Sequence, residues 1–259
     1  LRAAVVGILN TLLVAACGIV LATVMGFLMG ILRLSRNWLV NRLVYCFLEF
    51  TRNVPVLLHI LFIHGIIVTQ LRPPRQAMNF ADSFFLSNRG FYIPQPVWEP
   101  IAWIVAAVFL GSLVFVFFFK RWANNVQDET GRVYPIFWIS TGVIVGATAI
   151  AFFATGMPLS WSIPELKGFN FRGGLAIKPE FIALWLALSY YTSCFIAEIV
   201  RSGILAVSHG QTEAAYALGL RPNRTLQLII IPQALRVIVP PLTSQYLNLT
   251  KNSSLAIAI

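Results

Sequence analysis

The sequence predicts an all-α fold of the polytopic membrane class, built from helices that cross a bilayer. Of the 259 residues, 58% are hydrophobic and only 11% are charged, and the mean hydropathy is +0.78. These values lie outside the usage of soluble globular proteins. Several apolar runs also approach the ~20 residues that a helix needs to cross the hydrocarbon core. We therefore expect an integral membrane protein.

The first expected span covers residues 7–32, which is too long for the apolar core of a signal peptide and lacks a small-residue cleavage site. Five further apolar segments are expected to span the bilayer: 54–71, 101–119, 136–153, 181–200 and 237–259. We expect Pro240 and Pro241 to break the last one, since broken helices are tolerated where the freed backbone groups face a cavity or protein. The chain begins without Met and ends inside an apolar run, so it is expected to be cut at both ends.

The segment 33–52 repeats large apolar residues at helical spacing with Arg and Glu between them, which indicates an amphipathic helix. It either lies at the membrane interface or leads into the second span as one bent helix. We favour the bent helix, because Asn53 and Pro55 mark a break in the helical pattern.

A polar segment, residues 208–232, separates the last two spans. Ser208 and Gln211 have the spacing of a capping pair, and Gly219 is suited to a left-handed position that ends a short helix. Pro222 then fits the first turn of a second short helix. The apolar faces of two such short helices need a cover, which favours a docking site for another protein.

In this segment the chain resembles the cytoplasmic coupling loop of ABC importer permeases, whose pattern is Glu-Ala-Ala, three residues, Gly, nine residues, Ile-x-Leu-Pro. The positions in register are Glu213, Ala214, Ala215, Gly219, Ile229 and Pro232, with Ile231 in place of the Leu. The resemblance implies that this loop inserts into a groove on the ATPase subunit. It also implies the type I importer fold, in which that contact transmits ATP-driven closure to the membrane helices.

Other stretches resemble permeases for polar amino acids, among them RNVPVLLHILF from Arg52 and FIAEIVRSGI from Phe195. The resemblance assigns residues 1–71 and 179–259 to the permease core. Residues 72–178 then form an insertion with two transmembrane helices, similar to the larger permease subunit of general L-amino-acid uptake systems. The outer loops of this insertion either contact a periplasmic receptor or only connect helices.

Basic residues near the ends of the spans predict the orientation. Eleven fall on the side of the coupling loop: Arg33, Arg36, Arg42, Arg52, Lys120, Arg121, Arg132, Arg201, Arg221, Arg224 and Arg236. Seven fall on the other side: Arg2, Arg72, Arg75, Arg89, Lys167, Arg172 and Lys178. This bias, together with the alternation of spans, predicts a chain start outside and a cytoplasmic coupling loop.

Several other functions are disfavoured. The net charge of +10 is spread over short segments between spans, which indicates lipid headgroups rather than nucleic acid. No phosphate-binding Gly-x-x-x-x-Gly-Lys-Ser/Thr occurs, so ATP and Mg²⁺ are expected on a partner chain and this chain is expected to carry no cofactor. His59 and His64 are interpreted as packing residues, and the three cysteines, Cys17, Cys46 and Cys194, have no metal-ligand spacing. Neither an enzyme nor a metal site is expected.

Polar residues inside membrane segments are candidates for substrate binding, because their burial there is costly. The candidates are Lys251, Asn252, Ser253, Ser254, Asn248 and Asn10. The ammonium of Lys251 either pairs with the α-carboxylate of an amino acid or extends to the outer interface. The resembled family has Lys-Asp-Thr-Ser-Leu where this chain has Lys-Asn-Ser-Ser-Leu. The pairs Glu49 with Arg52 and Glu198 with Arg201 are interpreted as structural.

The resemblance implies a permease subunit of an ATP-driven L-amino-acid importer in the bacterial inner membrane. Its expected partners are an ABC ATPase, a second permease that is a different chain, a periplasmic amino-acid-binding protein and the lipid bilayer. A secondary transporter or channel for small polar solutes is the alternative. It would need no docking segment and would more often place paired carboxylates at mid-membrane. A non-catalytic membrane scaffold would explain the spans but not the coupling pattern.

Overall fold

The structure, a computed structural model, describes residues 2–258 and the side chains of residues 5–255. Contacts between residues divide the chain into two compact units. The first contains the described residues up to Met78, the short segment Leu86–Phe91 and the described residues from Ala176 onward. The second contains Asn79–Phe85 and Tyr92–Leu175.

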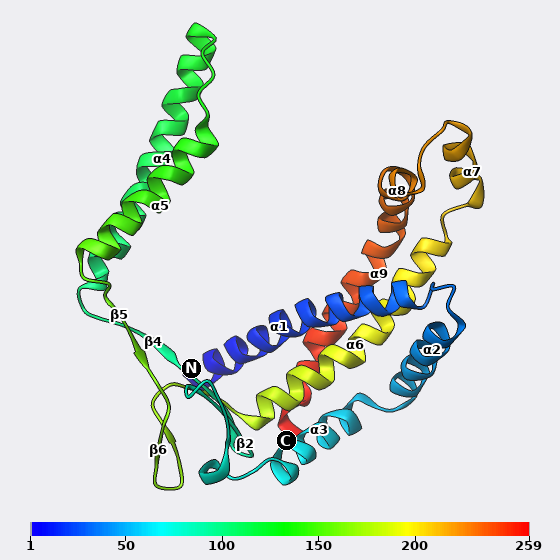
Figure 1. Ribbon diagram of the computed structural model, residues 1–259, viewed down its shortest axis with the longest axis horizontal. Helices are drawn as coiled ribbons and strands as arrows, with labels where there is room; N and C mark the ends of the chain where they lie inside the picture. Colours follow the sequence, from blue (N-terminus) through cyan, green and yellow to red (C-terminus); the bar gives the residue numbers. More distant parts are fainter. Residues whose placement is uncertain (1, 259) are drawn as a thin grey trace. The chain divides into compact units, whose positions relative to one another are not determined.

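The first unit is a bundle of long helices arranged around one central helix. Its main helices are α1 (Arg2–Leu32), α2 (Trp38–Asn53), α3 (Val56–Gln70), α6 (Pro179–Leu205) and α9 (Ile231–Asn252). Helix α6 packs along α1, α3 and α9, and its buried residues dominate the core (Figure 1). The outward faces of α1 and α9 remain apolar and exposed, as expected for helices that lie in lipid.

Close packing of α1 on α6 depends on small residues at every fourth position of α1: Gly18, Ala22, Gly26 and Gly30. A Cβ added at Gly26 would lie 2.5 Å from Cγ2 of Ile196, and one at Gly30 would lie 2.8 Å from the carbonyl oxygen of Ala197. Such spacing lets two helix backbones approach closely in a membrane, where packing rather than water exclusion drives association.

Helices α2 and α3 form a broken pair rather than one bent helix. Their axes differ by 102°, and Val54 and Pro55 separate them. The expected break at Asn53 and Pro55 is therefore found, but it is sharp enough to end one helix and begin another. Asn37 caps α2 through its side-chain oxygen, which accepts hydrogen bonds from the backbone N–H groups of Leu39 and Val40.

The expected break at Pro240 and Pro241 is wrong, because α9 continues through both prolines. The two rings remove only the hydrogen bonds to the carbonyls of Arg236 and Val237. An apolar surrounding offers the other backbone groups no alternative partner, so they keep their helical bonds. The irregular turn lies earlier, at the π-helical η2 (Leu226–Ile230), which joins α8 (Pro222–Thr225) directly to α9.

The second unit contains the antiparallel helix pair α4 (Ala102–Thr130) and α5 (Ile136–Ala154), which pack on each other. It also contains two antiparallel strand pairs, of which only the second joins strands that follow each other directly in the chain. Strand β4 (Gln95–Trp98) pairs with β5 (Leu159–Ser162), with Gln95 opposite Ser162, and β6 (Glu165–Lys167) pairs with β7 (Asn170–Arg172), with Glu165 opposite Arg172.

A four-stranded sheet has the order β1-β2-β3-β8, with β1 at Met78–Phe80, β2 at Phe84–Ser87, β3 at Gly90–Ile93 and β8 at Leu175–Ile177. The expectation that only loops flank the two inserted helices missed these strands, which precede α4 or follow α5. Each has only three or four residues, which is too short for a hydrophobic period to be recognised. The fold remains predominantly helical. Within the described residues 2–258, five helices are long and apolar enough to cross a membrane, or six if α2 and α3 together count as one span.

Candidate functional site

The coupling segment, residues 208–232, lies at the end of the first unit where α6 leads into α7 (His209–Ala217) and α9 begins (Figure 1). The segment is mostly exposed. Gln233 donates a hydrogen bond through Nε2 to Oε1 of Gln211 at 3.2 Å, which connects the start of α9 to α7. Thr225 is buried and its hydroxyl donates to the carbonyl of Arg221 at 3.2 Å. The first contact therefore ties α7 to the start of α9, and the second stabilises α8 itself.

Gly219 ends α7 in the left-handed conformation predicted from the sequence, with φ at 75°. Its N–H donates to the carbonyl of Tyr216 at 2.9 Å, and the N–H of Leu220 donates to the carbonyl of Ala215 at 3.1 Å. This pair of bonds is the Schellman motif, which satisfies the last carbonyls of a helix. A Cβ at Gly219 would meet no atom within 4 Å, so the requirement for glycine comes from the backbone angle alone.

The start of α7 differs from the predicted capping pair. Ser208 precedes the helix, but its side chain makes no capping hydrogen bond, and the N–H of Gln211 instead donates to the carbonyl oxygen of Ser208 at 3.1 Å. The amide of Gln211 is engaged with Gln233, so it does not reach back to the cap. The prediction of a reciprocal cap is therefore wrong.

The exposed face of α7 carries an acidic residue beside apolar ones. The side chain of Glu213 is 76% exposed, and its Oε1 lies 3.9 Å from Nδ1 of the His209 imidazole. Leu218 is 81% exposed, although it is a large apolar residue. Of the two alanines, Ala214 lies on the exposed face while Ala215 is buried inside the chain. This surface is suited to a partner that buries Leu218 and supplies a basic or hydrogen-bonding group to Glu213.

The other end of the segment joins α9. Ile229 is half-buried in η2, whereas Ile231 and Pro232 are exposed at the first turn of α9. The exposed pair faces away from the core of the first unit. The sequence-predicted coupling residues therefore divide into two groups. The buried Ala215 and the half-buried Ile229 support the segment, and the others are exposed and available for contact.

The candidate substrate residues lie mainly at the far end of α9. Lys251 and Asn248 are exposed and Asn252 is half-buried. The hydroxyls of Ser253 and Ser254 donate to the carbonyls of Thr250 and Lys251 at 2.6 and 2.7 Å, so both hydroxyl hydrogens are used by the backbone.

Asn10 is not part of this group. It is exposed on α1, and the contact of Gly18 with Leu249 sets the two helices in register. At a rise of 1.5 Å per residue, Asn10 lies about 12 Å along α1 from the contact between Gly18 and Leu249. Lys251 lies only about 3 Å along α9 from the same contact.

The family comparison concerns the second half of the chain. Residues 129–259 match the family model described as the binding-protein-dependent transport system inner membrane component. The chain belongs to this family. With its five to six candidate spans, this family member is a multi-pass inner-membrane protein. The matched residues include α6, the whole coupling segment and α9.

Individual relatives match over most or all of the chain. It is 48% identical over 258 residues to the general L-amino acid transport system permease protein AapQ of Rhizobium johnstonii, with 100% of this chain and 64% of AapQ covered. It is 50% identical over 260 residues to YhdX of Escherichia coli K12, with 100% and 66% covered.

It is also 42% identical over 261 residues to BztB, a glutamate/glutamine/aspartate/asparagine transport system permease protein of Rhodobacter capsulatus, with 88% and 61% covered. The chain thus spans between 61% and 66% of the length of these relatives.

Sequence reasoning missed one arrangement in this family member. The sequence indicates for Arg52 and Glu198 only a pair within one helix each. Both pairs are present, with Arg52 Nη1 at 3.5 Å from Glu49 Oε1 and Arg201 Nη1 at 2.9 Å from Glu198 Oε1. However, Arg52 and Glu198 also line the same cavity, from two different helices. The available signal was the presence of opposite charges in two helical segments that are far apart in the chain, which by itself does not show that the charges meet.

Proposed function

We propose that the chain is the permease subunit of an ATP-driven importer of L-amino acids and forms half of its translocation pore. The observation that carries this proposal is the exposed surface of α7, with Glu213 and Leu218 next to a Schellman end at Gly219. A helix that exposes a carboxylate and a leucine beyond the ends of the membrane helices is suited to insertion into a groove of a soluble partner. That partner would be the ATPase subunit.

The chain itself would carry no cofactor, and ATP and Mg²⁺ would bind the ATPase subunits. ATP binding would close the ATPases, move the coupling segment and shift the pore from inward to outward access. Such a shift requires that the ATPases bind one state of the permease more tightly than the other. The coupling segment is connected to α9 through continuous helix from Pro222, so its movement would be transmitted directly to a helix of the bundle.

The proposed assembly contains a second permease, which is a different chain, and a periplasmic amino-acid-binding protein. AapQ is named as a general L-amino acid permease protein, and BztB as a permease protein for glutamate, glutamine, aspartate and asparagine. These names support the proposed class of substrate. We also propose the orientation predicted from the basic residues, with the chain start outside and the coupling segment in the cytoplasm. Lys251, together with Asn248 and Asn252, is proposed to contact substrate at the outer end of α9.

Two substitutions test the docking surface. Gly219→Val places a β-branched residue at φ 75°, a conformation that is strongly disfavoured for such residues, and should distort the end of α7. Glu213→Lys reverses the charge of the exposed carboxylate without changing the fold. Both variants should insert in the membrane but release the ATPase subunit, and both should reduce ATP-dependent uptake by at least about tenfold, the equivalent of ~1.4 kcal/mol.

The measurements are co-purification of the ATPase and uptake of a radiolabelled L-amino acid into proteoliposomes in the presence of the binding protein. Gly210→Val is a matched control, because Gly210 lies in the same helix and a Cβ there would meet only the hydroxyl of Ser208 at 3.8 Å. This control should retain both activities. Full uptake and normal ATPase binding by Gly219→Val would contradict the docking assignment.

A further inference from the structure

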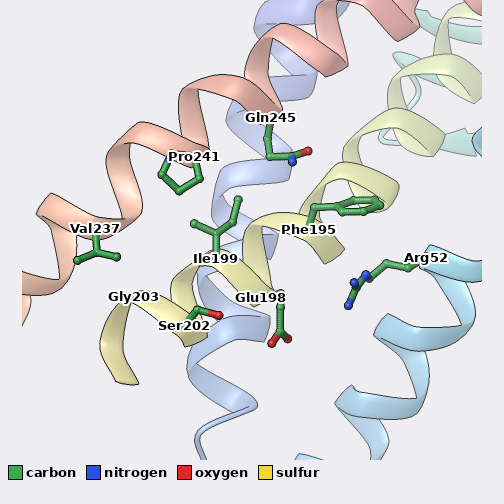
Figure 2. Close-up of a pocket in the computed structure, with 9 residues that line it drawn as sticks. All are labelled: Arg52, Phe195, Glu198, Ile199, Ser202, Gly203, Val237, Pro241 and Gln245. Carbon is green, nitrogen blue, oxygen red and sulfur yellow. The ribbon is translucent and has the colours of Figure 1, made fainter. Parts of the chain in front are cut away.

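A cavity of about 290 Å³ lies within the first unit, between α2, α6 and α9. Figure 2 shows Arg52 extending from α2 on one side and Phe195, Glu198 and Ile199 on α6, with Gln245 of α9 opposite. The volume is at the lower end of the range for small-molecule sites. A ligand of this cavity would therefore be small, of the size of a single amino acid.

Two opposite charges approach this cavity from different helices. The side chains of Arg52 and Glu198 are 35% and 34% exposed, so each is partly removed from solvent. Each has a partner on its own helix through one atom: Nη1 of Arg52 at 3.5 Å from Glu49, and Oε1 of Glu198 at 2.9 Å from Arg201. Neither ion pair uses the second terminal guanidinium nitrogen of Arg52 or the second carboxylate oxygen of Glu198.

The surroundings fix one of these charges and supply neutral hydrogen-bonding groups. The guanidinium of Arg52 lies 5.5 Å from the centre of the Phe195 ring, a cation–π contact that holds it over α6. Ser202 and Gln245 also line the cavity, and the rest of the lining is largely apolar. The cavity thus combines a cation, an anion, two neutral polar groups and apolar walls.

Purely structural ion pairs would not require this arrangement. Pairs at i and i+3 stabilise a helix on whichever face they lie, and each is complete within its own helix. Neither Glu49 nor Arg201 lines the cavity, whereas the cation of one pair and the anion of the other do. A ligand with a carboxylate and an ammonium on adjacent atoms, and with an apolar remainder, matches this combination.

We propose that this cavity binds the zwitterionic head of an L-amino acid, with Arg52 on the α-carboxylate and Glu198 on the α-ammonium. The inference rests on the proposed function. Because recognition uses the groups common to all amino acids, the site would accept various side chains, and the apolar walls would favour an aliphatic one. In the proposed orientation the site lies in the cytoplasmic half of the pore, since Glu198 is seven residues from the end of α6 at Leu205.

The test compares L-leucine with two analogues that each lack one charged group. The compound 3-methylbutylamine has no carboxylate, and 2-hydroxy-4-methylpentanoate has no ammonium. Binding of each compound is measured by calorimetry on the purified complex of the full-length chain with its second permease and ATPase subunits. Arg52→Gln should weaken leucine at least tenfold but leave the amine unchanged, and Glu198→Gln should weaken leucine at least tenfold but leave the hydroxy acid unchanged.

Glu49→Gln and Arg201→Gln are matched controls, because each removes the partner of the same ion pair without altering the lining of the cavity. They should bind leucine within threefold of the unmodified complex. Three results would each overturn the site. The first is an equal loss of leucine affinity in the control and test variants, and the second is an equal loss of affinity for leucine and both analogues. The third is the absence of leucine binding by the unmodified complex.

ATP-dependent uptake of L-leucine, measured on the same preparation, separates this inference from the proposed function. If the unmodified complex imports leucine while Arg52→Gln and Glu198→Gln bind it normally, the site is wrong and the proposed function stands. If the unmodified complex imports no amino acid, the proposed function is wrong and the site falls with it.

Discussion

The ring nitrogen Nε2 of His59 lies 3.1 Å from the backbone carbonyl oxygen of Thr51, across the break between α2 and α3. In an uninterrupted helix this carbonyl would accept from the N–H of residue 55, but that residue is Pro55 and has no N–H. A carbonyl oxygen only accepts, so His59 is the donor. His59 therefore replaces the backbone hydrogen bond that the proline removes.

This relationship predicts that His59 stabilises the 102° break. Both Thr51 and His59 are buried, so a variant without the donor leaves the carbonyl unpaired. We expect His59→Phe to lower the free energy of unfolding by about 1–2 kcal/mol, measured by thermal unfolding of the purified chain in detergent. His64→Phe, on the same helix, is the control and should change it by less than about 0.5 kcal/mol. Equal effects of the two variants would contradict the role of His59.

The small residues of α1 lead to a second prediction. Gly26→Ala should destabilise the bundle by about 1–3 kcal/mol, because the added Cβ would lie 2.5 Å from Cγ2 of Ile196. Combining it with Ile196→Ala removes the clashing methyl group, so the two losses should not add. Gly7→Ala, at a position with no atom within 4 Å, is the matched control and should be neutral or slightly stabilising. Additive losses in the double variant would show that α1 and α6 do not pack in this register.

How much of this structure could be predicted depended on whether the deciding interaction was local. The left-handed end at Gly219 followed from the sequence because only a few adjacent residues determine it. The fate of Pro240 and Pro241 did not, since their effect depends on whether the surroundings offer the freed backbone groups another partner. Local propensity therefore predicted a break where the environment preserves the helix.

The cavity between α2, α6 and α9 shows the same limit for the site. Arg52 and Glu198 are far apart in the chain, and each has a partner three residues away that provides a sufficient local explanation. Only the packing of the helices places both at one cavity. The coupling segment could be predicted from the sequence, because its residues lie within a single stretch and their spacing could be compared with a known pattern.

The orientation gives a third prediction. Single cysteines at Asn125 in α4 and at Lys167 in β6 replace exposed residues, in a background where the native cysteines are changed to serine or alanine. An impermeant thiol reagent should label position 125 only in inverted vesicles and position 167 only in right-side-out vesicles. Labelling of both after solubilisation in detergent is the control. If both positions react from the same side, the pair α4 and α5 does not cross the membrane twice.

The last prediction concerns Lys251, which is exposed near the end of α9. If its ammonium meets the α-carboxylate of the substrate, Lys251→Met removes a charge-assisted hydrogen bond of about 1.5–3 kcal/mol and should lower uptake at limiting substrate about tenfold or more. Ser254→Ala is the control, because that hydroxyl already donates to the carbonyl of Lys251 at 2.7 Å, and it should leave uptake unchanged.

Uptake of a neutral, an acidic and a basic amino acid distinguishes the possible roles of Lys251. All three should decrease together, because the α-carboxylate is common to them, whereas a loss restricted to the acidic substrate would place the ammonium near the side chain of the substrate. A lysine that only extends to the outer interface predicts unchanged kinetics for all three, since a single exposed charge contributes little. That last result would remove Lys251 from the transport path and leave the outer end of α9 without a charged contact for substrate.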